Sequence, residues 1–176
     1  MNKIFFLGLP LLLTGCASLL STPFPTVRPD DFQLEYYWET GSLPPPYFYS
    51  YRITLGPGTR AEIEFQADYS GDNTPVWLEV IDITENDLDQ LYEMLYTMGM
   101  FEKEWLQATD TPAGGSASYL KGVAYGQAFS IPSFVAGDQQ ARDARALYEH
   151  IEGLVPRETW VKLLALHDDY VAENEE

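Results

Sequence analysis

The chain has 176 residues, with 27 acidic against 10 basic side chains and a formal net charge of −17 at pH 7. This charge disfavours nucleic-acid binding, which needs clustered lysine and arginine, and anionic lipid headgroups should repel the folded body. The acidic excess fits solubility, or alternatively attraction to a basic protein partner or to divalent cations. Cys16 is the only cysteine, so no disulfide can form within the chain.

The N-terminus contains, in the order typical of a bacterial lipoprotein signal, a basic residue, an apolar run and a cysteine motif. Lys3 precedes an apolar run over residues 4–13, which is too short to span a bilayer as a helix. The following Leu13-Thr14-Gly15-Cys16 resembles a lipobox. The resemblance implies that residues 1–15 are removed as a signal peptide and that Cys16 carries acyl chains such as palmitate. Two or more chains anchor a protein stably to a membrane.

The residue after the cysteine is Ala17 rather than aspartate. In a Gram-negative host, this resembles lipoproteins of the outer membrane, held in its periplasmic leaflet. Residues 16–30 contain three prolines and predict a semi-extended lipidated tether. We expect a single globular domain over residues 31–172 and a frayed acidic tail over residues 173–176.

Three runs near residues 32–39, 47–55 and 61–69 alternate apolar with polar side chains between glycines and prolines. This period of two predicts half-buried antiparallel strands. One face of the sheet should be exposed to solvent, with its charged side chains paired across neighbouring strands. A fourth run over residues 76–83 carries apolar groups in both registers. It is therefore either a central strand covered on both sides or the source of an exposed apolar patch.

Thr84 predicts the N-cap of a helix with leucines at helical spacing, and Gly99 is placed to end it. A hairpin turning at Tyr125-Gly126 follows. Asp138 can cap a second helix, and Pro156 opens a third. Strands followed by helices predict an α+β fold, an antiparallel sheet of about five to six strands with two or three helices packed on one face.

The sequence contains no catalytic constellation. The two histidines, His150 and His167, lie outside any His-Glu-x-x-His pattern, and Asp168 and Asp169 do not share a helix face with His167. The run Asp68–Asn73 is loosely similar to a calcium loop but lacks the EF-hand spacing, so a polar strand connection is the alternative. We predict no catalytic residue, no metal ligand and no cofactor.

Aromatic residues are dense in the first two predicted strands. Because apolar and polar residues alternate in these strands, we expect most of the aromatic side chains to lie in the core. The alternative is an exposed aromatic platform that binds sugar rings or a partner protein. Tyr37 falls on the outward register, and the turn with three successive prolines is rigid enough to bind at little entropic cost. Our candidate partner-binding residues are Tyr37, Pro44, Pro45, Pro46 and Trp77.

The middle of the chain resembles emfourin-type protease-inhibitor domains in layout, with a sheet, a leucine-spaced helix, a glycine loop and a tyrosine-rich hairpin. The residues that carry this resemblance are Leu88, Leu91, Leu95, Gly99, Phe101, Pro112, Gly114, Gly115, Tyr119 and Gly126. The resemblance implies a similar fold and transfers no inhibitory residue. The leading prediction is a lipid-anchored, non-enzymatic envelope protein that binds another envelope protein. The alternatives are a carboxylate-based hydrolase, a sugar-binding protein or a protease inhibitor.

Overall fold

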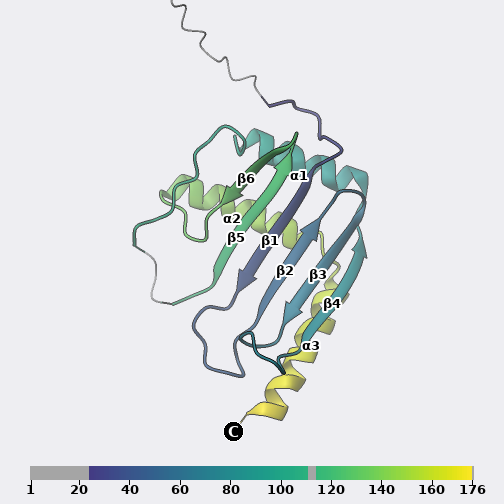
Figure 1. The fold of residues 1–176 in the computed structure, drawn as a ribbon, viewed down its shortest axis with the longest axis vertical. Coiled ribbons are helices and arrows are strands. Elements are labelled where there is room, and N and C mark those ends of the chain that lie inside the picture. The colour runs from purple at the N-terminus through teal and green to yellow at the C-terminus, as the bar shows by residue number, and fades with distance from the viewer. Residues whose placement is uncertain (1–23, 111–113, 176) are drawn as a thin grey trace, which may run out of the picture.

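A computed structural model describes residues 24–110 and 114–175, so the predicted signal peptide and Cys16 lie outside the described residues. The described chain forms one six-stranded antiparallel sheet, in the order β4-β3-β2-β1-β5-β6, and three helices (Figure 1). The predicted α+β class is confirmed. The elements are β1 Gln33–Glu39, β2 Ser50–Leu55, β3 Arg60–Gln66, β4 Val76–Asp82, α1 Glu85–Thr97, β5 Ala117–Ala124, β6 Gln127–Ile131, α2 Asp138–Gly153 and α3 Arg157–Asn174.

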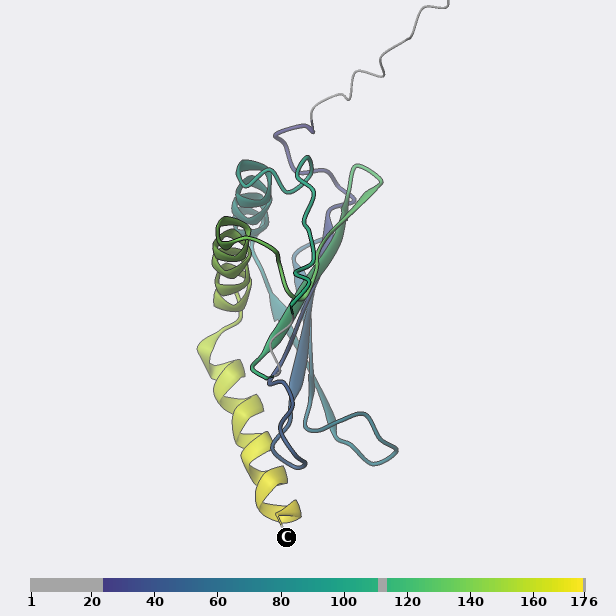
Figure 2. The ribbon, with the colours of Figure 1, turned by 90° about the vertical axis from the view of Figure 1, so that its left-hand side faces the viewer.

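All three helices lie on one side of the sheet, and the other side is bare (Figure 2). The apolar register of each central strand faces the helices, as the alternation predicts. In β1 and β2, for example, Tyr36 lies opposite Ile53, and both are almost fully buried. The polar register forms the bare side, which we call the open face.

β4 is an edge strand, which settles the two alternatives for the fourth run. It pairs with β3 over seven consecutive residues and with no other strand of the described chain. Its outward register places three branched side chains on the open face, Val76, Leu78 and Val80, with 48%, 59% and 62% of their surface exposed. We call these three residues the β4 apolar row.

The first helix begins and ends as predicted. The Thr84 hydroxyl accepts a hydrogen bond from the backbone N–H of Asp87, and the Asp87 carboxylate accepts one from the N–H of Thr84, which completes a capping box. After the helix, Gly99 has a φ of 69°, a conformation that favours glycine. The buried stripe of α1 comprises Leu88, Leu91, Tyr92 and Leu95.

The described part of the predicted tether packs against the domain. Phe24 stacks on Phe101 with ring centroids 4.4 Å apart, and the Tyr92 hydroxyl donates to the carbonyl of Pro25 at 2.8 Å. Arg28 forms ion pairs with Glu85 and Asp89 of α1. The packed part of the chain therefore begins by Phe24, before the expected boundary at residue 31.

The last two helices differ slightly from the prediction. Asp138 is the first residue of α2 rather than its cap, because Gly137, with a φ of 86°, occupies the N-cap position without a side-chain hydrogen bond. Pro156 is the N-cap of α3. Helix α3 continues to Asn174, and the Tyr47 hydroxyl donates to the Glu175 carboxylate at 2.6 Å, so the predicted tail begins inside an ordered helix.

Gly122 gives a test of strand packing. A Cβ atom there would lie 2.6 Å from the backbone carbonyl oxygen of Gln33 and would also meet the ring of Phe129. We expect Gly122→Ala to lower the free energy of unfolding by about 1–3 kcal/mol, measured by urea denaturation. Gly153→Ala is the matched control, because a Cβ there meets nothing within 4 Å and alanine favours helix. Equal stability of the two variants would contradict the packing at Gly122.

Candidate functional site

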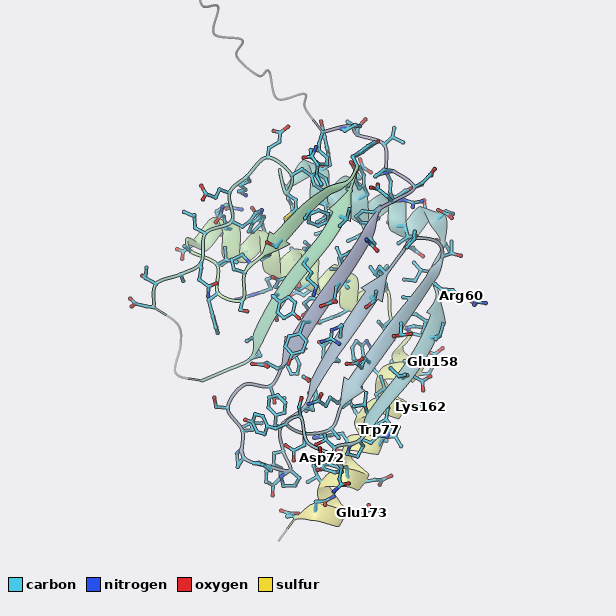
Figure 3. All side chains as sticks on the ribbon, viewed as in Figure 1. Arg60, Asp72, Trp77, Glu158, Lys162 and Glu173 are labelled. Atoms are coloured by element: carbon cyan, nitrogen blue, oxygen red, sulfur yellow. The ribbon has the colours of Figure 1, made fainter. Side chains whose placement is uncertain are left out.

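The predicted partner-binding residues do not form one surface. Tyr37 lies on the open face and stacks on Tyr119 of β5, with centroids 5.0 Å apart. Trp77 faces the opposite way, toward the helices, with its ring 5.8 Å from that of Phe65. Figure 3 shows Trp77 beside α3, on the β4 side of the molecule.

The triple-proline turn lies between β1 and β2 and is only partly available to a partner. Pro44 and Pro45 are exposed, but Pro46 is buried. The turn is fastened to the β3–β4 connection, because the Tyr69 hydroxyl donates to the carbonyl of Leu43 at 2.8 Å. It is therefore a supported loop rather than a free projection.

Charges on the open face pair across strands, as predicted. Glu35 of β1 accepts from Lys121 of β5 at 3.0 Å and lies 3.4 Å from Arg52 of β2. Arg52 also forms an ion pair with Glu64 of β3 at 2.8 Å. Each such exposed pair stabilises the fold by only about 0–1 kcal/mol. The network does fix a polar surface over the four central strands and leaves the β4 apolar row beside it.

The helix-facing side of the sheet contains an aromatic cleft. Its main hollow, about 590 Å³, lies between α2 and the strands β1 and β5. A smaller hollow of about 210 Å³ adjoins it toward α3, and Trp38 and Glu152 line both. We use the name aromatic cleft for these two hollows, whose principal walls are Tyr36, Trp38, Tyr51, Tyr148, Glu152 and Trp160.

Glu152 is the charged centre of the aromatic cleft. The hydroxyls of Tyr36 and Tyr51 both donate to its Oε1, at 2.6 and 2.7 Å. Helical spacing brings Glu152 there, because Ala141, Arg145 and Tyr148 precede it by eleven, seven and four residues along one face of α2. Glu152 is half-buried and forms no ion pair with any described residue.

Burial raises the pKa of both tyrosines that serve Glu152. For Tyr36 and Tyr51, loss of solvation is the largest cause, and the nearby carboxylate adds to it because a second negative charge is unfavourable there. Burial alone raises the pKa of Tyr148, which stacks on Tyr36 at 4.9 Å. Its hydroxyl is buried with no hydrogen-bond partner among the described residues.

The histidines and the Asp68 loop do not assemble a metal centre. His167 is buried against the rings of Tyr49 and Phe65, a packing role. Asp68 accepts from the N–H of Tyr69 at 2.7 Å and from the Tyr170 hydroxyl at 3.3 Å. Across residues 24–110 and 114–175, no group of three or more histidine, cysteine or acidic side chains is placed to hold a metal ion.

No family model matches this chain, and no curated protein matches it in sequence. The resemblance to emfourin-type domains therefore stays a prediction. None of the helices in the described residues is long and apolar enough to cross a membrane.

The aromatic cleft is the feature that the sequence analysis missed. Alternation correctly turned Tyr36 and Tyr51 inward, and a buried tyrosine hydroxyl usually finds a hydrogen-bond partner. That rule calls for an acceptor on a covering helix, and Glu152 lies one helical turn after Tyr148 in α2. Glu152 can be identified as this acceptor only when it is known which helix covers β1 and β2, and only the tertiary structure gives that information.

The raised tyrosine pKa values predict the alkaline behaviour of the fold. Tyr36 and Tyr51 bind their protons more tightly in the folded state than in the unfolded state. Their protonation therefore contributes to the free energy of unfolding, and this contribution is complete below about pH 10 and is lost as the pH rises above it. We expect Tyr51→Phe to make the decline of the unfolding free energy shallower by up to about 1.4 kcal/mol per pH unit. Urea denaturation between about pH 9 and 11 measures this, and parallel slopes for the two proteins would contradict it.

Proposed function

We propose that this chain is a non-enzymatic binding domain, attached to a bacterial cell envelope by lipid on Cys16, and that it binds another envelope protein through β4. In a Gram-negative host, its place is the periplasmic leaflet of the outer membrane. The observation that carries the binding proposal is the β4 apolar row on an edge strand whose outer side pairs with no other strand of the described chain.

An edge strand of this kind is a template for association. Soluble proteins usually protect such edges with prolines, lysines or bulges. The strand Val76–Asp82 contains no proline or lysine, and its pairing with β3 runs without a bulge. Its only charged residues are two acids outside the β4 apolar row: Glu79, which pairs with Lys162 of α3, and Asp82 at the end of the strand. Three exposed branched side chains in one row offer apolar contact, while the outer edge of the strand offers backbone hydrogen bonds, the combination used when an extended segment adds to a sheet.

The packing of Phe24 limits how far the domain can lie from its proposed anchor. Seven residues lie between Cys16 and Phe24, so an extended chain spans at most roughly 29 Å from one to the other. Lipid on Cys16 would therefore hold the domain close to the membrane, within reach of partners anchored in the same leaflet. This proximity supports a partner from the envelope rather than one that diffuses freely.

The anchor is tested by the variant Cys16→Ala. We expect the wild-type chain to incorporate radiolabelled palmitate and to lose its leader, and the variant to do neither, because acylation needs the thiol. Labelling in the host cells and the mass of the purified product measure this. Thr14→Ser is the matched control, since it keeps a small residue in the motif, and it should label like the wild type. Equal labelling of Cys16→Ala would exclude the anchor.

The binding surface is tested by photo-crosslinking from position 78. A photoreactive side chain at Leu78 should crosslink the full-length chain in its host to one envelope protein in near-stoichiometric yield. Val161 of α3 is the matched control, because both residues have 59% of their surface exposed. It should give little product. Crosslinking only between copies of this chain, or equal yields at the two positions, would contradict the proposal.

A further inference from the structure

We propose that the aromatic cleft binds a small organic ammonium ion, with Glu152 as its counter-charge and the rings of Trp38, Tyr148 and their neighbours as its walls. This site lies on the helix-facing side of the sheet, whereas the β4 apolar row lies on the open face. The proposal is therefore independent of the envelope partner at β4.

The first observation is a carboxylate without a cation. Burying a charge is costly unless it is paired, and proteins usually pair such a group with lysine or arginine. Glu152 instead receives two neutral hydroxyls, both on Oε1. No described side chain donates a hydrogen bond to its other oxygen, Oε2, so one face of the carboxylate is left for a ligand.

The second observation is the electrostatic setting of Glu152. It is the penultimate residue of α2, where the helix dipole places partial negative charge and favours cations. The charged residues that line the larger hollow are three acids, Asp110, Glu149 and Glu152, against one base, Arg145. Arg145 lies seven residues earlier in α2, roughly 10 Å away along the helix axis, and forms no ion pair with Glu152.

The third observation is the chemistry of the walls. Tyrosine and tryptophan rings attract cations held against their faces, and cages of aromatic rings are typical receptors for quaternary ammonium groups. Trp38 lines both hollows, and Trp160 fastens α3 to the site by donating its ring N–H to the carbonyl of Glu152 at 3.2 Å. Tyr148 lines the larger hollow, whereas its hydroxyl is buried and unpartnered within the described chain.

The volume favours a small molecule. A hollow of about 590 Å³ falls within the range of ligand pockets, which is about 300–1,000 Å³. It would admit an alkylammonium or quaternary ammonium ion together with a short polar substituent. A bare metal ion is disfavoured, because Glu152 is not part of any metal-binding cluster in the portion of the chain that the structure describes.

The test compares cations with neutral molecules of the same shape. Choline and its uncharged isostere 3,3-dimethyl-1-butanol, and pentylammonium and 1-pentanol, are titrated into the full-length chain in a polyoxyethylene detergent. Side-chain NMR signals of Trp38 and Tyr148 report binding at the cleft, and calorimetry gives the affinity. We expect at least one ammonium ion to bind at least about ten-fold more tightly than its neutral isostere.

Two variants test separately how the charge of Glu152 and the aromatic walls of the cleft contribute to ammonium binding. Glu152→Gln keeps an oxygen that can accept from Tyr36 and Tyr51 but removes the charge, and it should weaken ammonium binding at least about ten-fold. Trp38→Leu removes an aromatic face without altering the carboxylate and should also weaken it. Glu158→Gln is the matched control, because Glu158 is exposed on α3 and lines neither hollow, and it should change the affinity by less than about three-fold.

The titration of the wild-type chain decides the proposal even if a variant fails to fold. Equal affinity for a cation and its neutral isostere would overturn it, as would the absence of signal changes at Trp38 and Tyr148 with either ammonium ion at millimolar concentration. Binding of N-acetylglucosamine or maltose in the cleft without ammonium binding would also overturn it and would assign the walls to sugar stacking. None of these results bears on crosslinking from Leu78, so the two proposals can fail separately.

Discussion

Burial of one register of the sheet against three helices is the constraint on which the other features of this fold depend. Each strand can send only alternate side chains to the helices, so the remaining register must form a solvent-facing surface. On the helix-facing side, hollows remain where β1 and β5 meet α2 and where the sheet meets α3, and these form the aromatic cleft. The β4 apolar row is therefore a consequence of a sheet covered on one side only, whereas the aromatic cleft is formed on the covered side by the packing of α2 and α3.

Tyr36 and Tyr51 show that stability alone does not explain the cleft. Phenylalanine would fill the same core space without a hydroxyl that needs a partner, and replacing buried polar groups by apolar ones of similar shape can be nearly neutral. The chain instead places two hydroxyls on one carboxylate and leaves that carboxylate without a cation among the described residues. Such an arrangement holds Glu152 in a fixed position, as a preorganised ligand site requires.

Local patterns predicted most of the fold because local forces decide those elements. The N-cap at Thr84 and the alternation in β1, β2 and β3 depend on neighbouring residues, and both were predicted correctly. The position of β4 was left open, because apolar groups in both registers fit an edge strand as well as a central one. Trp77 was grouped with Tyr37, although strand pairing turns the two residues to opposite faces. Pairing order and helix placement are long-range properties, and the candidate sites depend on both.

The N-terminal packing gives these surfaces an orientation. Phe24 stacks on Phe101, beyond the end of α1, and Arg28 pairs with Asp89 of α1. Asp31 accepts from the backbone N–H groups of Tyr125 and Gly126 at the β5–β6 turn. β1 then runs away from this end for seven residues, about 23 Å. If lipid on Cys16 holds the attached end at the membrane, the second half of β1, with Trp38, lies distal to it. A small ligand would then reach the cleft from the aqueous side, while the β4 apolar row runs along the flank that a partner in the same membrane can reach.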